Sequence, residues 1–447
     1  GKLSNNISAA TKAPTQDPME CKTLHSWDEL LKILSTEALK SVEVITREEL
    51  PIRMSLNLSA ALAMNRSLLD LTLIVDATAA LGLQGLKQNT MLKHLTLHVQ
   101  HWGTSGEVGR AVADVLKQNS SLRSFSLKAD SSNLQDKTGK LLAEALPQNS
   151  SLASLHLSCQ NTRVGDETGI AMAEALWLND TLRHFSWAAD GTDISDASGR
   201  TLAQGVQQNC NLETFRLSAS STGITDESGK AMVSVLKENL ALQHFSFEAS
   251  ETLLSDSTGL AFASSLGSTS LRSFCFVASF SNISDKTCQA IAESAGSTHL
   301  TSMEFIALHV LVSAETSIRL RNALQRNASL QFIKFETCQL DGDHAYITVQ
   351  EAVQTAMQKN QHMCERKPGC PRFQLPLCTQ SFSKALDTSF SHDWGSAVVG
   401  NSEHNDLVLR SGKLSTDSLS DTDVGDAAEA ITTASTETPV WESLHGV

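Results

Sequence analysis

Two stretches of the sequence carry residue types that could bind phosphate or metal. The segment 223–230, GITDESGK, has the glycines and the lysine of a phosphate-binding loop, which holds phosphate with backbone N–H groups. Five residues separate its glycines, one more than the phosphate loop allows, and Ala231 stands where Ser or Thr would bind magnesium. Gly229-Lys230 also recurs as Gly139-Lys140. A repeated structural role is therefore favoured over nucleotide binding.

Metal-binding residue types also gather at His362, Cys364, Cys370 and Cys378. Their C-x5-C-x7-C spacing fits no compact zinc site, so unpaired thiols are the favoured interpretation. The sequence contains neither H-E-x-x-H nor G-x-S-x-G, the patterns of zinc peptidases and serine hydrolases. We therefore expect no catalytic residue, no metal, no cofactor and no small-molecule substrate. On these grounds the chain is not expected to be an enzyme.

The composition narrows the class of partner. The 447 residues carry a formal net charge of -14, which argues against nucleic acid because phosphate binding requires clustered Lys and Arg. No stretch approaches the ~18 apolar residues of a membrane helix. The nine cysteines are scattered and odd in number, which favours a reducing compartment, and no signal-type segment opens the chain. We expect a cytoplasmic protein whose partner is another protein.

A repeat of about 30 residues organises the chain. Its units share the strand pattern L-x-x-[LF]-x-[LFW], whose last two positions point to the same side of a strand. We expect these positions to lie in the core. The first Leu of the pattern recurs at eleven positions, which are Leu39, Leu68, Leu92, Leu122, Leu152, Leu182, Leu212, Leu242, Leu271, Leu300 and Leu330.

Each expected strand leads to a loop, to Asp-x-[ST]-Gly and to a helix, as at Asp136 with Gly139 and at Asp226 with Gly229. We expect the Asp to cap its own helix, because its carboxylate can accept the free N–H groups of the first turn. Small or apolar residues then recur at helical spacing, which turns one helix face inward. Asn closes most units, as at Asn119, and we expect it in the left-handed conformation that ends a helix.

This repeated sequence pattern resembles the ribonuclease-inhibitor-like leucine-rich repeats, which also occur in the C-terminal arrays of NOD-like receptors and in Ran GTPase-activating proteins. The resemblance covers about residues 39–360. It implies an α/β leucine-rich-repeat solenoid, or horseshoe, of about eleven strand units, with a parallel concave sheet and convex helices. The sequence departs from this family just after the strand. There Leu127-Lys128-Ala129 and Leu217-Ser218-Ala219 stand in place of the usual Asn or Cys.

The ends of the chain are expected to differ from the repeats. Residues 1–20 are polar and are expected to form a disordered N-terminal tail. Residues 21–38 are expected to form an N-terminal cap helix, because S-W-D-E at 26–29 reads as a capping box. The repeat array, with a C-terminal cap helix, is expected over residues 39–363. Residues 364–447 are acidic and rich in Ser and Thr, which predicts a largely disordered tail.

Residues beside the core positions of each strand are expected to face the concave side, where solenoids bind partners. They are mostly Ser, Thr and His, and Arg216 is the main expected hot spot. His156 and His184 lie on adjacent expected strands and could share a metal or a pH-sensitive contact, although two solvated histidines are favoured. On a helix, Trp177 could mark a convex contact, although burial under its neighbour is favoured. The expected binding residues are His94, Thr96, Ser126, His156, His184, Ser186, Arg216, His244, Ser246, Glu304 and Lys334.

The leading hypothesis is a non-catalytic protein-protein interaction scaffold, or the ligand-sensing repeat array of a NOD-like receptor. The alternative is a Ran-type GTPase-activating protein that acts on a small GTPase. The resemblance permits both roles, and an acidic tail also follows the array in the Ran-type family. A fold alone does not decide between them.

Overall fold

The computed structural model describes residues 21–36, 39–46, 50–101, 106–338 and 353–355. The chain divides into two units, residues 1–376 and 377–447, and every described residue lies in the first unit. The strands are β1 Cys21–Leu24, β2 Ser41–Val44, β3 Asp70–Asp76, β4 His94–His101, β5 Ser124–Lys128, β6 Ser154–Ser158, β7 His184–Ala188, β8 Thr214–Ser218, β9 His244–Glu248, β10 Ser273–Val277, β11 Ser302–Ala307 and β12 Phe332–Thr337.

A helix follows most of these strands. The α-helices are α1 Trp27–Thr36, α2 Ile52–Met64, α3 Ala80–Leu83, α4 Glu107–Gln118, α5 Asp136–Ala145, α6 Asp166–Leu178, α7 Asp196–Gln208, α8 Asp226–Glu238, α9 Asp256–Ser265, α10 Asp285–Ser294 and α11 Ala314–Arg326. Short 3-10 turns are η1 Ala77–Ala79, η2 Gln84–Lys87, η3 Leu146–Gln148 and η4 Leu266–Ser268.

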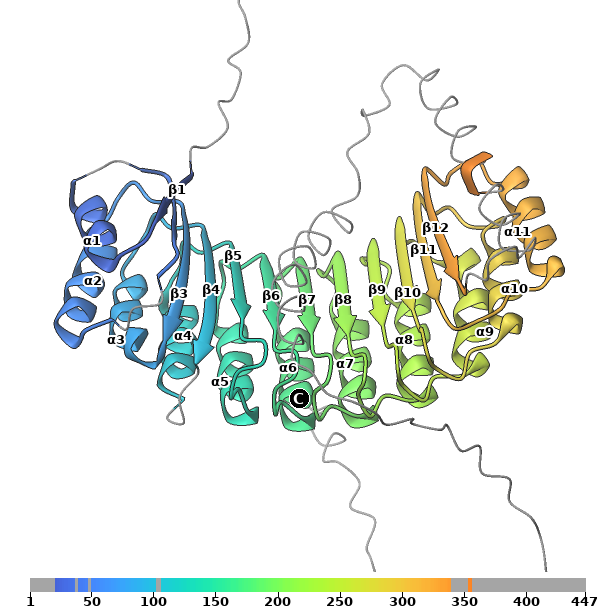
Figure 1. The fold of residues 1–447 in the computed structure, drawn as a ribbon, viewed down its shortest axis with the longest axis horizontal. Coiled ribbons are helices and arrows are strands. Elements are labelled where there is room, and N and C mark those ends of the chain that lie inside the picture. Colours follow the sequence, from blue (N-terminus) through green and yellow to red (C-terminus); the bar gives the residue numbers. More distant parts are fainter. Residues whose placement is uncertain (1–20, 37–38, 47–49, 102–105, 339–352, 356–447) are drawn as a thin grey trace, which may run out of the picture. The chain divides into compact units, whose positions relative to one another are not determined.

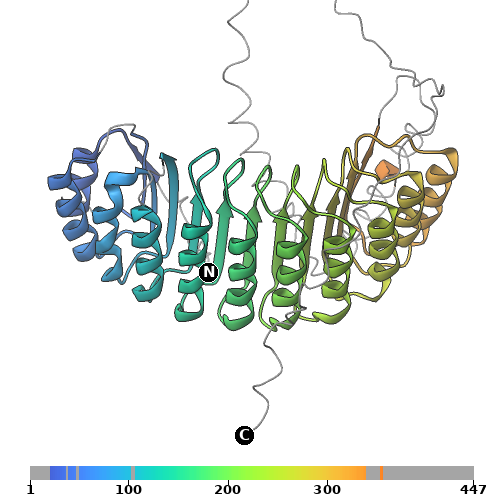
Figure 2. The same ribbon diagram turned by 90° about the horizontal axis from the view of Figure 1, so that it is seen from below.

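The twelve strands form one parallel sheet in chain order from β1 to β12. Neighbouring strands pair at equivalent repeat positions, so that Phe185 lies opposite Phe215 and Phe215 lies opposite Phe245. The helices lie along one face of the sheet (Figures 1 and 2). The predicted solenoid of alternating strands and helices is therefore present. We name the sheet face away from the helices the open face.

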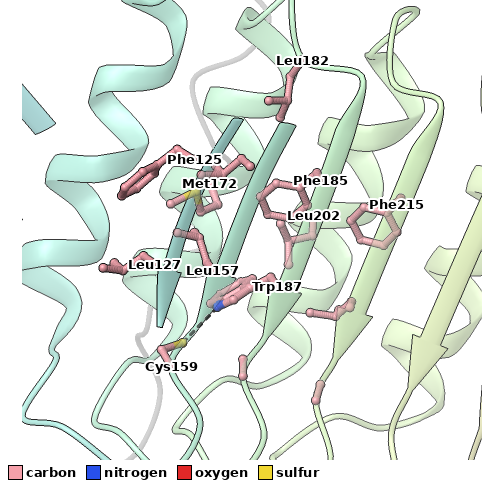
Figure 3. Packing of buried hydrophobic residues seen from close by; sticks show 14 of the residues in the cluster. Phe125, Leu127, Leu157, Cys159, Met172, Leu182, Phe185, Trp187, Leu202 and Phe215 are labelled. Carbon is pink, nitrogen blue, oxygen red and sulfur yellow. Dashed lines mark hydrogen bonds between the residues drawn. The ribbon is translucent and has the colours of Figure 1, made fainter. Parts of the chain in front are cut away.

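The core lies between the sheet and the helices. The inward strand positions are fully buried, as at Leu182 and Phe215, and Figure 3 shows their side chains between the strands and the helix layer. Phenylalanine rings at one position stack from strand to strand, with centroids 6.0 Å apart between Phe185 and Phe215 and between Phe215 and Phe245. Such stacked pairs add to the free energy of burial. Trp187 donates its Nε1 hydrogen to Sγ of Cys159 at 3.1 Å.

The repeated Asp joins one repeat to the next, and the prediction that it caps its own helix was wrong. Asp196 is the first residue of α7, and Ser195 occupies the N-cap position. The Asp196 carboxylate instead accepts hydrogen bonds from the backbone N–H and hydroxyl groups of Thr225 and Ser228 in the following repeat, at 2.5 to 3.2 Å. It therefore satisfies the free donors at the start of α8. Equivalent contacts are made by Asp136, Asp166, Asp226, Asp256 and Asp285.

The Gly of the same motif makes room for this contact. A Cβ atom added to Gly229 would lie 2.2 Å from Oγ1 and 2.5 Å from Cγ2 of Thr258. That Oγ1 donates to Oδ1 of Asp226 at 2.6 Å. Asp, Ser or Thr, and Gly thus form one inter-repeat unit, which explains why the motif imitates a phosphate-binding loop without being one.

The repeated Asn also binds the preceding repeat, and it does not adopt the left-handed conformation that we expected. Asn209 has φ -80 and ψ 114, an extended backbone. Its Nδ2 donates to the carbonyl oxygens of Leu176 at 2.6 Å and Asn179 at 2.9 Å, and its Oδ1 accepts from the N–H groups of Asn211 and Leu212. The side chain is only 3 % exposed. We name this series of contacts the Asn ladder.

Left-handed residues occur instead in the loop after the strand. The small residues at the first loop position, such as Ala129 and Ala219, are fully buried. They occupy the place where the family usually has Asn or Cys. The chain then turns through a residue with φ between 53 and 64, at Ser131, Asn161, Gly191, Ser221, Glu251 and Phe280.

The ends of the array differ in part from the expected boundaries. Residues 21–24, expected within the cap helix, form strand β1, which pairs with β2. Helix α1 follows, with Ser26 Oγ accepting from the N–H of Glu29 at 3.3 Å. At the C-terminal end, Val353 is 6 % exposed and packs into the core cluster. The rest of the expected cap helix and the two predicted tails lie outside the described residues.

Candidate protein-binding face

Side chains cross the open face in three rows, one row for each outward position along the strands. The structure places the eleven residues expected on the concave side in the first two rows. His94, His184 and His244 lie in the first row, and Thr96, Ser126, His156, Ser186, Arg216, Ser246, Glu304 and Lys334 lie in the second.

The third row holds charged residues that the sequence reasoning missed. His98 pairs in register with Lys128 on β5, and Glu248 lies opposite Ser218 and Val277 in the adjacent strands. The strand pattern L-x-x-[LF]-x-[LFW] includes only the two outward positions that flank its core residues. Because outward positions alternate with inward ones, extending each strand by one residue beyond its last inward position finds this row.

Three histidines of the open face, His98, His156 and His244, have a lowered pKa. Burial lowers the pKa of His156 and of His98, and the nearby Lys128 ammonium lowers both further. Burial, followed by the Arg216 guanidinium, lowers the pKa of His244. A neutral imidazole offers one donor and one acceptor to a partner.

His156 and His184, for which a shared contact was the less favoured alternative, do not lie directly opposite each other. In the register of β6 and β7, His156 lies opposite Ser186, and His184 lies opposite Ser154. His184 instead forms a hydrogen bond through Nδ1 with Thr214 Oγ1, at 3.0 Å. A contact between neighbouring strands thus fixes the His184 ring.

The other end of the open face is acidic and buried. Burial, together with the Asp190 carboxylate, raises the pKa of Glu248 to about 7, although a hydrogen bond from Ser246 and the Arg216 guanidinium favour its charged form. Burial also raises the pKa of Glu304, against the opposing effect of Lys334. Glu304 lies opposite Cys275 on β10 and Lys334 on β12. The open face therefore changes from neutral and basic side chains to partly buried carboxylates along the array.

Other candidate positions do not form a reactive site in the part of the chain that the structure describes. No group of three or more His, Cys, Asp and Glu is placed there to hold a metal ion. Burial raises the pKa of the Cys159 thiol to about 12, so this cysteine is a poor nucleophile. Each helix within the described ranges is too short or too polar to cross a bilayer. On the helix side, Trp177 is 46 % exposed rather than buried under its neighbour.

The chain matches no family model and no curated protein. It is similar to three solved structures. These are actin-binding site 2 of leiomodin-1 (19% identity, 36% of this chain and 90% of that chain, TM-score 0.30), a chain of the Rad7 and Elc1 complex in yeast (17%, 68% and 78%, TM-score 0.40) and an internalin from Listeria monocytogenes (13%, 70% and 71%, TM-score 0.40). Similarities this distant carry no argument about function.

The repeating geometry decides the fold. Twelve parallel strands in chain order alternate with helices on one face, and most units carry the same Leu, Asp and Asn contacts. The fold is a leucine-rich-repeat solenoid. On the open face of β4 to β8, polar side chains are partly accessible at regular spacing.

Proposed function

We propose that this solenoid is a non-catalytic scaffold that binds another protein on its open face. The observation that carries the proposal is the continuous row of outward side chains on β4 to β8, which helices α4 to α8 leave uncovered because they lie on the other face (Figures 1 and 2). A sheet held in register by every neighbouring strand presents these groups with little freedom to lose on binding, which favours affinity.

The proposed contacts combine hydrogen bonding with one strong cation. Ser126, His156 and Ser186 supply donors and acceptors, while the Arg216 guanidinium can pair with a carboxylate. We therefore expect a partner that presents polar and acidic groups, with Arg216 contributing the largest share of the binding free energy. A cytoplasmic location, predicted from the scattered thiols, stays a prediction.

Affinity capture from lysate with the full chain tests the proposal. Arg216→Glu should weaken binding of the captured partner at least tenfold, because it replaces an attractive charge with a repulsive one. Lys286→Glu on α10 makes the same change of charge on the helix side and serves as the control. If Arg216→Glu binds the same partner as strongly as the parent does, the open face is not the site and the proposal fails.

The two finer roles are distinguished by what the captured partner does. If the partner is a small GTPase, the rate of GTP hydrolysis with and without the chain separates a Ran-type activator from a passive scaffold. An increase of a hundredfold or more would favour the activator. An unchanged rate would favour a scaffold or the sensing array of a NOD-like receptor.

A further inference from the structure

The edge of the sheet carries exposed apolar side chains in the loops that follow β9, β10 and β11. These loops come directly after the arrowheads of the three strands (Figure 1) and comprise residues 249–255, 278–284 and 307–313. Their exposed apolar residues are Leu253, Phe280, Leu308 and Leu311, which are 67, 63, 46 and 53 % exposed. We name these four side chains the apolar rim. An exposed apolar patch on a folded chain often marks a binding site.

The four preceding repeats hold polar residues or Gly at two of these loop positions. The residues equivalent to Leu253 are Asn133, Arg163, Asp193 and Gly223. The residues equivalent to Phe280 are Ser131, Asn161, Gly191 and Ser221. The repeat therefore forms these loops without an apolar residue at either position, and the fold does not explain the apolar rim.

Phe280 occupies its place at a cost to the stability of the loop. Its φ is 56, a left-handed backbone conformation in which the Cβ of a bulky residue crowds the carbonyl oxygen that follows it. Gly191 adopts the same conformation in the loop after β7 without that crowding. A side chain that is both strained and exposed adds little to the core. Contact with another molecule is therefore the better explanation of Phe280.

Hydrogen bonds between adjacent loops hold the apolar rim in one arrangement. The N–H of Glu251 donates to the carbonyl oxygen of Ser279 at 2.8 Å, and the N–H of Leu308 donates to Oγ of Ser279 at 3.1 Å. The N–H of Phe280 donates to Nδ1 of His309 at 2.7 Å, and the centroids of the Phe280 and His309 rings lie 5.9 Å apart. The loops thus continue the spacing of the strands, and their side chains have little freedom to lose on binding.

The charges beside the apolar rim indicate the chemistry of its partner. The three loops contain no Lys or Arg, and the carboxylate of Glu251 is exposed among them. The helices that follow the first two loops begin with further carboxylates, Asp256 and Asp285. Such a surface repels an anionic membrane and attracts a protein that carries Lys or Arg beside its apolar residues.

We propose that the apolar rim binds an amphipathic helix of a protein partner, with one apolar residue of that helix on each of the three loops and a Lys or Arg beside Glu251. Residues i and i+7 of a helix lie about 10.5 Å apart along its axis. The first and third loops lie about 9.6 Å apart at the usual strand spacing of about 4.8 Å. A helix that crosses the strands can therefore place residues i, i+4 and i+7 on the three loops, where their removal from water favours binding.

Fluorescence anisotropy with labelled peptides and the full chain tests this contact. The probes are helical peptides of about 18 residues with Leu, Ile, Met or Phe at i, i+4 and i+7 and Lys beside these positions. A matched set has the same composition in scrambled order. The best helical peptide should bind the parent at least tenfold more tightly than its scrambled counterpart does.

The decisive variant combines Leu253→Asn with Phe280→Asn and should weaken binding of that peptide at least tenfold. Asn stands at the equivalent positions of other repeats, as Asn133 and Asn161. The urea midpoint of the variant should therefore not fall below that of the parent, which separates lost binding from lost folding. Leu240→Asn is the matched control, since Leu240 is 78 % exposed in the turn after α8, and it should leave peptide binding unchanged.

Charge reversal tests the predicted ion pair. Glu251→Lys should weaken binding of the Lys-bearing peptide and strengthen binding of a peptide with Glu in place of Lys. The contact does not rest on the proposed function, because the peptides probe the apolar rim alone. Arg216→Glu with a captured partner tests the open face, so either proposal can fail while the other stands.

Three results would overturn the proposal. The first is that no helical peptide binds the parent more tightly than the Leu253→Asn, Phe280→Asn variant. The second is that vesicles of phosphatidylcholine and phosphatidylserine bind the parent and not this variant, because the apolar rim would then contact a membrane. The third is a dimer of the parent, seen by analytical ultracentrifugation and lost in the variant, because a second copy would then occupy the apolar rim.

Discussion

Replacement of Gly229 by Ala tests the inter-repeat contact against the usual helix propensity. In an ordinary helix this change stabilises the folded chain by about 1 kcal/mol, because Ala loses less conformational entropy than Gly on folding. Here the new methyl group would lie 2.2 Å from Oγ1 and 2.5 Å from Cγ2 of Thr258. Thr258 would have to move, and its 2.6 Å hydrogen bond to the Asp226 carboxylate would be lost.

The costs of overpacking and of the lost hydrogen bond together exceed the gain in helix propensity. Overpacking costs about 1 to 3 kcal/mol, and loss of a hydrogen bond to a charged group costs about 1.5 to 3 kcal/mol. After the propensity gain is subtracted, Gly229→Ala should lower the free energy of unfolding by about 1.5 to 5 kcal/mol. Urea denaturation followed by circular dichroism measures this change through the transition midpoint.

A double-mutant cycle identifies the cause. Thr258→Ala removes both atoms that the new methyl group would meet most closely, and leaves a Cβ at 2.9 Å. In that background, Gly229→Ala should cost at least 1 kcal/mol less than in the parent. If Gly229→Ala raises the urea midpoint, or costs the same in both backgrounds, the Gly has no role in this contact and the reasoning is refuted.

Three further changes address the same contacts and the acidic end of the open face. Asp196→Ala removes four hydrogen bonds from the next repeat and should lower the free energy of unfolding by about 3 kcal/mol, whereas Asp180→Ala on an exposed turn should have little effect. Burial would raise the pKa of Asp196, but the hydrogen bonds to its carboxylate outweigh burial and lower that pKa. The contribution of Asp196 to the free energy of unfolding is therefore present above the unfolded pKa of about 3.9 and is lost as pH falls below that value. The parent should therefore lose more stability than Asp196→Ala when urea midpoints are compared at pH 6 and pH 3. Asn209→Ala should also cost about 3 kcal/mol in the same assay, because it leaves buried backbone groups without partners. Glu248→Gln should stabilise the chain at pH 8 but not at pH 5, since the parent must hold a buried carboxylate above its pKa of about 7; equal shifts at both pH values would contradict this.

The spacing of Leu and Phe was sufficient to predict the strands and the inward face of each. This succeeded because the pattern is local: Phe215 and Leu217 lie two residues apart and must point the same way in any strand. The short strand Cys21–Leu24 was not predicted, since only one of its four side chains is buried. This strand is held in the sheet by its pairing with β2 rather than by a hydrophobic pattern of its own.

The roles of Asp196 and Asn209 could not be predicted from a single unit. Each has a residue type that is common at helix ends, and local reasoning assigned it to its own helix. Their partners lie about 30 residues away, at Thr225 and at Asn179, and become neighbours only when the repeats stack. The burial of Glu304 was unforeseen for a similar reason, because it depends on residues outside its own strand.

The Asn ladder does not run the full length of the solenoid. In the two 29-residue units the turn is one residue shorter, and Thr269 and Thr298 stand where Asn would be. The Thr298 hydroxyl is buried without a partner in the described ranges. The same stretch instead has an aromatic core, in which the Phe262 ring lies 4.9 Å from Phe276 and 5.5 Å from Phe274.

One array is therefore stabilised by two kinds of interaction with different temperature dependence. Apolar burial weakens on cooling and carries a large heat-capacity change, whereas hydrogen bonds between backbone and side chain do not share that change. The repeats around Phe262 should thus be the first to open in the cold, and those around Asn149 to Asn209 the last. Because repeats in a solenoid contact only their neighbours, the units that lack the Asn should differ in cold stability from the units before them and from the unit that Asn327 closes, which a uniform array would not show.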